Sequence, residues 1–559
     1  MKYRKPSILL LIFCSIMLLA QGNVGYIQPV YSPDGQKILL SKMDHEGIYC
    51  FDKTSNEMYE ITASMGSGYK VNWSYDGSKI AFKMISPEKG QAPVILDLAS
   101  QKLLYLAPYT LRCGVPFFAS DGKISFSIDQ EIFVLNPDYT ILARIPVENY
   151  ANLCVISPNS KWIAYNDEND SIWLASLENR TKIQATKDEQ SYFSPIFSPD
   201  GESLLVSTLS GTLKVISISS MEIQTLDEGE NPVWMPDGKS VVYSKKRIES
   251  GEMINSDLYQ IECATGNKQQ LTRSSLYFES HCAYDSNTQS FLICDQKSGK
   301  LYTSIGSSRS LQNADLESSS SLFLLPTPKP LSCKESPSIL NVTLPPAREE
   351  SRASISGVPY IHQVYDTPNW FNGNWACGAT SATMAMTYYK LLANWDCTVS
   401  VPYSHVSHFG RYICEVYTYN GYTFNKMTAD ASNKAAYGGY GYICQNNWEN
   451  TKSHMAEYLK KHGVGSSVDW SPSWAKVQSE INNKHPFVIL NALTSSGHYI
   501  LGIGYYNNQH TVIVNDPYGN KNLPGYPNYK GADSSYDWPG YNNGYKNLNN
   551  VSCFIYARK

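Results

Sequence analysis

The sequence predicts a multidomain protein in which an all-β propeller of about seven blades is followed by a smaller α+β domain. A turn-centred unit recurs along the first half of the chain at intervals of 37 to 49 residues. A mixed pattern of helices and strands replaces it after about residue 357. At 559 residues, the chain is also too long for one ordinary hydrophobic core.

Residues 1–22 have the pattern of a secretory signal peptide. Three basic residues precede an apolar stretch from Ile8 to Leu19, and small residues follow from Ala20 to Gly22. The apolar stretch is short for a membrane span. We therefore expect an exported protein, periplasmic or secreted, with cell-surface association as a further option and no membrane span in the mature chain.

Residues 23–312 contain the repeated unit. In its clearest copies an aromatic strand enters a Pro-Asp-Gly turn, where proline presets φ and glycine takes the positive-φ position. An apolar strand follows the turn, and two more strands complete the unit. The turns are marked by Asp34, Asp76, Asp121, Asn159, Asp200, Asp237 and Ser286. Their spacing fits four short strands, which is the size of one propeller blade.

Seven markers predict seven blades. Because the seventh copy is degenerate, six blades with a variant closing piece are the alternative. The units resemble the TolB-type β-propeller repeat, in which an aromatic residue leads into Ser-Pro-Asp-Gly, as at 31–35 and 197–201. The resemblance implies a binding module for a protein or cell-envelope partner, an expectation that rests on fold analogy.

Residues 313–356 differ in composition from both neighbours. A serine run at 318–321 is followed by six prolines, and no hydrophobic period is visible. This pattern predicts a semi-extended linker between two independently folding domains. A Pro-rich arm packed on the propeller is the alternative.

The C-terminal domain, residues 357–559, is organised around Cys377. A turn-rich segment precedes this cysteine, and apolar residues follow it at helical spacing to about Ala393. A thiol at a helix start faces unpaired backbone N–H groups and the positive end of the helix dipole, which favour the nucleophilic thiolate. Taken alone, such a cysteine is equally well explained as a small buried hydrophobic residue.

Further polar residues stand at the ends of predicted strands. His498 opens an apolar strand, and Asp516 directly follows another. A cysteine nucleophile requires a base that takes the thiol proton and an acid that orients the imidazole. Upstream, Gln363 carries an amide that, with the backbone N–H of Cys377, has the chemistry to hold a developing oxyanion.

The other elements of this domain indicate helices packed on an antiparallel sheet. Helices are expected at 452–462 and from Ser471, and strands at 487–491, 499–505, 511–515 and 551–556. Residues 396–450 are interpreted as an elaboration of this core. The segment 518–545, rich in Tyr, Asn and Gly, is interpreted as a surface loop, with an aromatic binding loop as the alternative.

From about Val358 onwards the sequence resembles the papain-fold cysteine peptidases similar to the bacteriocin-processing, double-glycine-leader peptidases. It has that family's motifs in order: a Gln, a Cys-Gly helix start, a Gly-His-Tyr strand and an Asn-Asp-Pro strand end. The resemblance implies an α+β papain-like domain with the following roles: Cys377 as nucleophile, His498 as base, Asp516 as orienting acid and Gln363 as oxyanion donor. The double-glycine substrate does not carry over, because no phosphate-loop motif and no helix-length apolar run follow the N-terminal segment.

We therefore expect an exported cysteine peptidase that hydrolyses peptide bonds of a peptide or protein substrate through a Cys377 thioester. His498 would take the thiol proton and later protonate the leaving amine. One alternative is a non-enzymatic binding protein with a peptidase-like scaffold. The other is a cell-wall peptide amidase or transpeptidase, which shares the thioester chemistry.

The net charge and the cysteine spacing indicate which ligands and cross-links to expect. A formal net charge of −4 gives no sign of nucleic-acid binding. No Cys/His cluster has zinc-ligand spacing, so neither a metal nor another cofactor is expected. Beside Cys377, the C-terminal domain holds Cys397, Cys414, Cys444 and Cys553. Four cysteines would suffice for two disulfides in an oxidising compartment.

Overall fold

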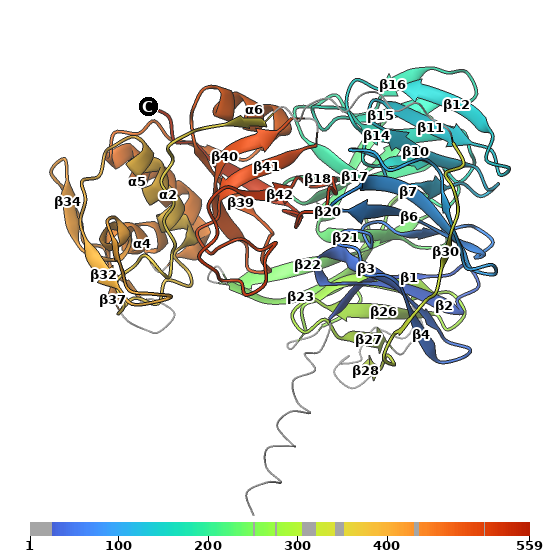
Figure 1. Cartoon of the computed structure of the whole chain (residues 1–559), viewed down its shortest axis with the longest axis horizontal. Coiled ribbons are helices and arrows are strands. Elements are labelled where there is room, and N and C mark those ends of the chain that lie inside the picture. The colour runs from blue at the N-terminus through green and yellow to red at the C-terminus, as the bar shows by residue number, and fades with distance from the viewer. Residues whose placement is uncertain are drawn as a thin grey trace, which may run out of the picture.

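The structure is a computed structural model that describes residues 25–249, 252–273, 277–304, 320–340, 352–429, 435–445, 447–507 and 509–559. The predicted signal peptide at 1–22 lies outside these residues, as do 313–319 and 341–351 of the predicted linker. Figure 1 shows a β-propeller with a second, mixed domain placed against one of its faces. None of the helices within the described ranges is both long enough and apolar enough to span a membrane.

Seven antiparallel sheets, each built from four successive strands, form the propeller, so the prediction of seven blades is confirmed. The blades are, in order, β1 (Tyr26–Tyr31), β2 (Lys37–Lys42), β3 (Glu46–Asp52) and β4 (Glu57–Thr62); β5 (Asn72–Trp73), β6 (Lys79–Ser86), β7 (Gly90–Asp97) and β8 (Lys102–Tyr105); β9 (Phe117–Phe118), β10 (Ile124–Ile128), β11 (Glu131–Leu135) and β12 (Ile141–Pro146); β13 (Cys154–Ile156), β14 (Trp162–Asn166), β15 (Ile172–Ser176) and β16 (Lys182–Gln184); β17 (Tyr192–Phe197), β18 (Ser203–Thr208), β19 (Thr212–Ser217) and β20 (Ile223–Glu228); β21 (Glu230–Trp234), β22 (Ser240–Glu249), β23 (Glu252–Glu262) and β24 (Lys268–Gln270); β25 (Glu279–Asp285), β26 (Ser290–Asp295), β27 (Leu301–Ser304) and β28 (Ser320–Phe323). A short helix, η1 (Met43–His45), joins β2 to β3.

The repeat markers lie in the turn between the first and second strands of the blades. In blade 1 the Asp34 carboxylate accepts hydrogen bonds from the Ser32 hydroxyl at 2.6 Å and from the Gln36 backbone N–H at 3.0 Å. In blade 5 Asp200 accepts the equivalent bond from the Ser198 hydroxyl at 2.6 Å. These local bonds explain why the turn recurs in the sequence.

Blades 7 and 1 share no strand, and the chain closes the ring in another way. After β28, the short strand β29 (Lys329–Pro330) pairs in parallel with β4, and β30 (Lys334–Glu335) pairs in parallel with β8. Residues 320–340 are therefore an arm across blades 7, 1 and 2, seen at β30 in Figure 1. This is the arm packed on the propeller that was the alternative for this segment, in place of a semi-extended linker. The outer strands of blades have open edges, which short segments can pair even when they contain proline.

A seven-stranded antiparallel sheet is the centre of the C-terminal domain, in the order β38–β43–β39–β40–β41–β42, with β31 also paired to β40. Its strands are β31 (Arg352–Ser354), β38 (Val468–Asp469), β39 (Phe487–Asn491), β40 (His498–Tyr506), β41 (Thr511–Asn515), β42 (Ser534–Asp537) and β43 (Val551–Ile555). The helices are α2 (Cys377–Tyr388), α3 (Gly410–Cys414), α4 (Gly438–Cys444), η3 (Trp448–Asn450), α5 (Thr451–Lys461) and α6 (Trp474–Asn482). Three small hairpins complete the domain: β32 (Cys397–Val399) with β33 (His405–Ser407), β34 (Tyr417–Tyr419) with β35 (Tyr422–Phe424), and β36 (Thr428–Ala429) with β37 (Ala435–Ala436).

Two details differ from the sequence-based expectation. Helix α2 ends at Tyr388 and not near Ala393, because Lys390 adopts a left-handed conformation with φ 57°. All twelve cysteines in the described part of the chain are free thiols, so the four beside Cys377 form no disulfides.

Side-chain alternation gives the sheet two apolar faces. On β39, Val488 packs with the helices α2, α4 and α5, whereas Phe487 and Ile489 pack with α6. The second of these clusters also contains Tyr150 and Leu209, which belong to the propeller. The two domains therefore share part of a hydrophobic core, which the expectation of independent domains did not include.

Residues 538–546 of the C-terminal domain enter this face of the propeller. The Asn152 amide donates to the Gly540 carbonyl at 2.8 Å, and the Asn542 amide donates to the Gly66 carbonyl at 2.7 Å. Both bonds are buried. This part of the chain is thus an interface segment, and the interpretation of 518–545 as a surface loop is wrong here, because a polar segment can be buried once its groups are paired.

We predict that Asp170, a propeller residue at this interface, makes stability depend on pH. Its carboxyl group accepts a bond from the Trp538 indole at 3.1 Å, and burial raises its pKa from 3.8 to about 8. The folded protein therefore holds a proton that the unfolded chain releases between about pH 4 and 8. Stability should fall as pH rises through this window, by at most about 1.4 kcal/mol per pH unit.

Asp170→Asn should remove this contribution while keeping an acceptor for Trp538. Urea denaturation at several pH values from 5 to 8 measures the effect. The advantage of the variant should grow with pH, and parallel curves for the two proteins would contradict the assignment.

Candidate active site

Cys377 is the first residue of α2, at its N-terminal end. The thiol is partly exposed, whereas residues 378–387 behind it are buried. A Cβ at the next residue, Gly378, would lie 2.7 Å from Met455 Cε of α5, so a larger residue there would require the Met455 side chain to shift. Glycine at this position therefore lets the start of α2 pack closely on α5.

His498 is the first residue of β40, which packs against α2. Its carbonyl accepts a bond from the Asn491 side chain at 3.0 Å, across the β39–β40 pair. The preceding turn is closed by Thr494, whose hydroxyl donates to the Gly497 carbonyl at 2.8 Å. The imidazole is buried, with 5% of the side chain exposed.

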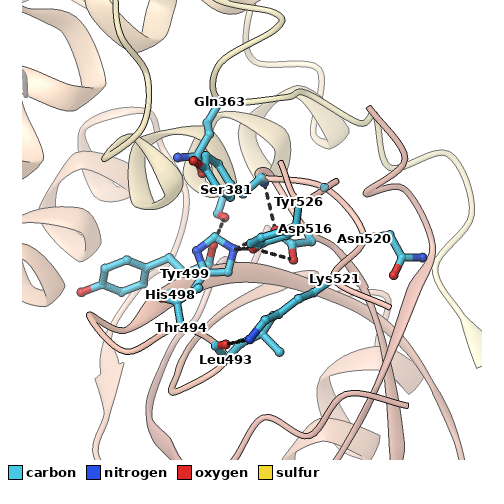
Figure 2. Close-up of polar contacts among 12 residues, drawn as sticks. Gln363, Ser381, Leu493, Thr494, His498, Tyr499, Asp516, Asn520, Lys521 and Tyr526 are labelled. Carbon is cyan, nitrogen blue, oxygen red and sulfur yellow. Dashed lines mark hydrogen bonds and ion pairs between the residues drawn. The ribbon is translucent and has the colours of Figure 1, made fainter. Parts of the chain in front are cut away.

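Asp516 directly follows β41 and is fully buried. Its Oδ1 accepts from His498 Nε2 at 2.7 Å and from the Tyr518 backbone N–H at 2.9 Å. Its Oδ2 accepts from the hydroxyls of Tyr536 at 2.7 Å and Tyr526 at 3.3 Å. Figure 2 shows His498, Asp516 and Tyr526 converging. The four donors match the acceptor capacity of one carboxylate.

The electrostatics of this group favour a charged imidazole. Burial acts to lower the pKa of His498, but the charge of Asp516 and the interaction with the Cys377 side chain outweigh it and raise that pKa from 6.5 to about 10. Asp516 occupies Nε2, which leaves Nδ1 as the ring nitrogen for the thiol. The structure thus brings the three predicted residues together, and their roles as nucleophile, base and orienting acid remain predictions.

Gln363 lies beside the residues that precede Cys377, and its side-chain amide already donates two hydrogen bonds to them. Its Nε2 donates to the carbonyls of Gly373 and Asn374, both at 2.9 Å, and its backbone N–H donates to Pro517 O at 2.8 Å. Gly373 makes this approach possible, because a Cβ there would lie 2.1 Å from the Gln363 carbonyl. Gln363 therefore joins the Cys377 loop to the Asp516 strand end, and its role as oxyanion donor remains a prediction.

The tyrosines around Asp516 were not predicted as site residues. Burial and the neighbouring Asp516 raise the pKa values of both Tyr526 and Tyr536, so both keep the protons they donate. The many tyrosines of segment 518–545 were the one sequence feature that pointed to them. That feature supported the interpretation as an aromatic binding loop, but an aperiodic segment gives no pattern from which to predict which rings are buried.

A second histidine–carboxylate pair lies close to Gln363. His405 Nε2 contacts Asp366 Oδ1 at 2.9 Å, and the Tyr529 hydroxyl donates to the same oxygen at 2.7 Å. Asp366 also accepts from the backbone N–H of His362, the residue before Gln363. This group supports the segment that carries Gln363. Among the described residues, no three His, Cys, Asp or Glu side chains gather as metal ligands would.

Comparisons with known proteins match separate parts of the chain. Residues 355–552 match the model of the Peptidase_C39 like family, a stretch that contains Cys377, His498 and Asp516. No curated protein sequence matches the chain. An oligogalacturonate lyase in complex with manganese aligns at 13% identity and a TM-score of 0.36, over 48% of this chain and 86% of its own. The β-propeller domain of Cps50 (Swd1) from Myceliophteria thermophila aligns at 11% and 0.35, over 44% and 84%.

We predict that His498 is an imidazolium at neutral pH and that Asp516 keeps it so. In Asp516→Asn, the charge that raises the pKa is lost while the burial that lowers it remains. The imidazole should then lose its proton below pH 7. Nitrogen NMR of the histidine-labelled protein, with His498→Ala to assign the signal, measures both titrations.

Asp366→Asn is the matched control, because it removes the same charge from the His405 pair. It should leave the His498 signal unchanged. A His498 ring that is already neutral at pH 7 in the unchanged protein would contradict the assignment.

Proposed function

We propose that the C-terminal domain, which is Peptidase_C39-like in fold, is a cysteine peptidase that hydrolyses peptide bonds through a thioester at Cys377. The observation that carries the proposal is the buried His498–Asp516 pair, with a 2.7 Å contact, beside a partly exposed thiol at a helix start. A protonated imidazole next to a cysteine is the arrangement that yields a thiolate nucleophile.

The geometry supports a two-step reaction. The Cys377 sulfur attacks the scissile carbonyl carbon, and His498 donates its proton to the leaving amine as the C–N bond breaks. A water then attacks the thioester carbonyl, and His498 takes one proton of that water. The C–S bond breaks, the carboxylic acid product leaves, and the Cys377 thiolate is restored beside the protonated His498. The backbone N–H of Cys377 is free of helical partners at this position and would stabilise the oxyanion, together with Gln363.

The setting of this activity is also proposed. The N-terminal pattern supports export, to the periplasm or outside the cell, and a peptide or protein would be the substrate. The propeller would bind a protein or cell-envelope partner through surfaces that the C-terminal domain leaves open. No nucleic-acid partner is proposed.

A cell-wall peptide amidase or transpeptidase is the second candidate. The thioester is common to both reactions, and only the acceptor differs: water in hydrolysis, an amine in transfer. Incubating the purified protein with peptide libraries and with cell-wall fragments, with and without an added amine, separates the two by the mass of the products. A scaffold without activity would release no product from either.

Four substitutions should reduce turnover in a fixed order. Cys377→Ala should abolish it, because no other group of the site can form the thioester. His498→Ala should be nearly as severe, since acid–base assistance alone contributes roughly 10²–10⁴-fold. Gln363→Ala should slow turnover by roughly 10²–10³-fold. Asp516→Asn should be mildest, because an amide can still orient the ring, as an Asn does in papain-like enzymes, and a neutral His498 can still take the thiol proton as the sulfur attacks.

Peptide cleavage rates at saturating substrate test this order, with Asp396→Asn as a control, because Asp396 pairs with His408 at an exposed position. Full activity in Cys377→Ala would refute the peptidase proposal. Unchanged cleavage in Gln363→Ala would refute only the oxyanion role of this residue.

A further inference from the structure

We propose that the propeller is a positioning element of the catalytic pair, and that Asp44 of blade 1 acts on Asp516 and His498 through Lys521 and Tyr536. This inference rests on the proposed function, because it concerns the same site. It gives the propeller a role inside the molecule, in addition to any partner that it binds.

The path begins with an ion pair between the domains. Asp44 lies in η1, between β2 and β3, and its Oδ1 is 3.5 Å from Lys521 Nζ. Its Oδ2 is 3.0 Å from Lys546 Nζ. Burial acts to raise the pKa of Asp44, but the two ammonium groups outweigh it and lower that pKa. One propeller carboxylate therefore binds two lysines of the C-terminal domain.

Lys521 continues the path to both members of the catalytic pair. Its backbone N–H donates to the Tyr536 hydroxyl at 2.9 Å, and that hydroxyl donates to Asp516 Oδ2 at 2.7 Å. Its ammonium donates to the Leu493 carbonyl, in the connection between β39 and β40 that leads to His498. Figure 2 shows this contact next to Thr494, below His498. Lys521 thus supports the acid and the base from one position.

Lys546 supports the same loop from its other side. Its backbone N–H donates to the Asn522 side-chain oxygen at 2.8 Å. The Asn522 amide in turn donates to the Ser535 carbonyl at 2.8 Å, in the strand that carries Tyr536. Lys521 therefore reaches Tyr536 directly through its backbone N–H, and Lys546 reaches the neighbouring residue Ser535 through Asn522.

Other contacts also hold the two domains together, so their association does not depend on the Asp44 ion pairs. The shared apolar cluster and the buried bonds from Asn152, Asn542 and Trp538 hold the interface without Asp44. Loss of the Asp44 charge should therefore leave the domains docked but loosen the 521–536 connection. An effect on the catalytic pair in a docked protein is what separates positioning from general support.

The test compares three variants of the full chain. Asp44→Asn removes the charge, and Asp44→Glu restores it. Asp34→Asn is the matched control in the same blade, at the opposite end of β2, where Asn159 already occupies the equivalent turn of blade 4. The first readout is the rate of Cys377 alkylation by iodoacetamide against pH, followed by mass spectrometry of the peptide that contains Cys377. The groups that face His498 in this readout are Cys377, Asp516, Tyr518 and Tyr526.

Asp44→Asn should slow alkylation at neutral pH by roughly threefold to thirtyfold and move its pH profile. Asp44→Glu should recover most of the rate, and Asp34→Asn should match the unchanged protein. In peptide cleavage, kcat should fall in Asp44→Asn while KM stays the same. Should Asp44→Asn fail to fold, Lys521→Met, which keeps the Asp44–Lys546 pair, should slow alkylation in the same direction.

Coincident alkylation profiles for Asp44→Asn and the unchanged protein would overturn the proposal, as would an unchanged rate in Lys521→Met. An equal loss in Asp34→Asn would also overturn it, since the effect would then be general to blade 1. A failed peptidase proposal is distinguishable: no peptide would be cleaved by any form, while the alkylation profiles would still differ.

Discussion

The buried contact between His498 and Asp516 is the interaction on which the arrangement of the C-terminal domain depends. Moving a charged pair out of water costs several kcal/mol per ion unless hydrogen bonds satisfy what remains. Here the carboxylate is fully buried, and its second oxygen is satisfied by Tyr526 and Tyr536. The tyrosine-rich segment after β41 is therefore required by the acid, since without it a buried charge would be left half paired.

That requirement explains why the propeller and the C-terminal domain are in such close contact. Tyr536 is followed by Trp538 and by the segment that enters the propeller face. Asp537, between them, accepts bonds from Thr511 and from the Asn543 backbone N–H, so hydrogen bonds join the strand end to the interface segment. Tyr536, which binds Asp516, is thus two positions away from Trp538, which is buried against the propeller.

The sequence predicted those features that have a local cause. Cys377, His498 and Asp516 each stand at the start or end of a regular element, and periodicity marks such boundaries. The blade turns recur because each is fixed by bonds within a few residues, as at Asp34. No local sequence pattern favoured the arm at 320–340 over a linker or predicted the ion pair between Asp44 and Lys521. Those lysine and aspartate residues are 477 positions apart, and no periodic pattern encodes a contact at that separation.

Gln363 shows how one residue can satisfy a motif while the structure gives it a second task. Its amide donates to Gly373 and Asn374, just before Cys377, and its backbone N–H donates to Pro517, just after Asp516. It therefore joins the two chain segments that would meet at the substrate in the proposed reaction. An oxyanion formed next to Cys377 would compete with the Asn374 carbonyl for one amide N–H. A charged acceptor forms the stronger bond, so the contact is strengthened only as negative charge develops, which is the condition for stabilising a transition state and not the bound substrate.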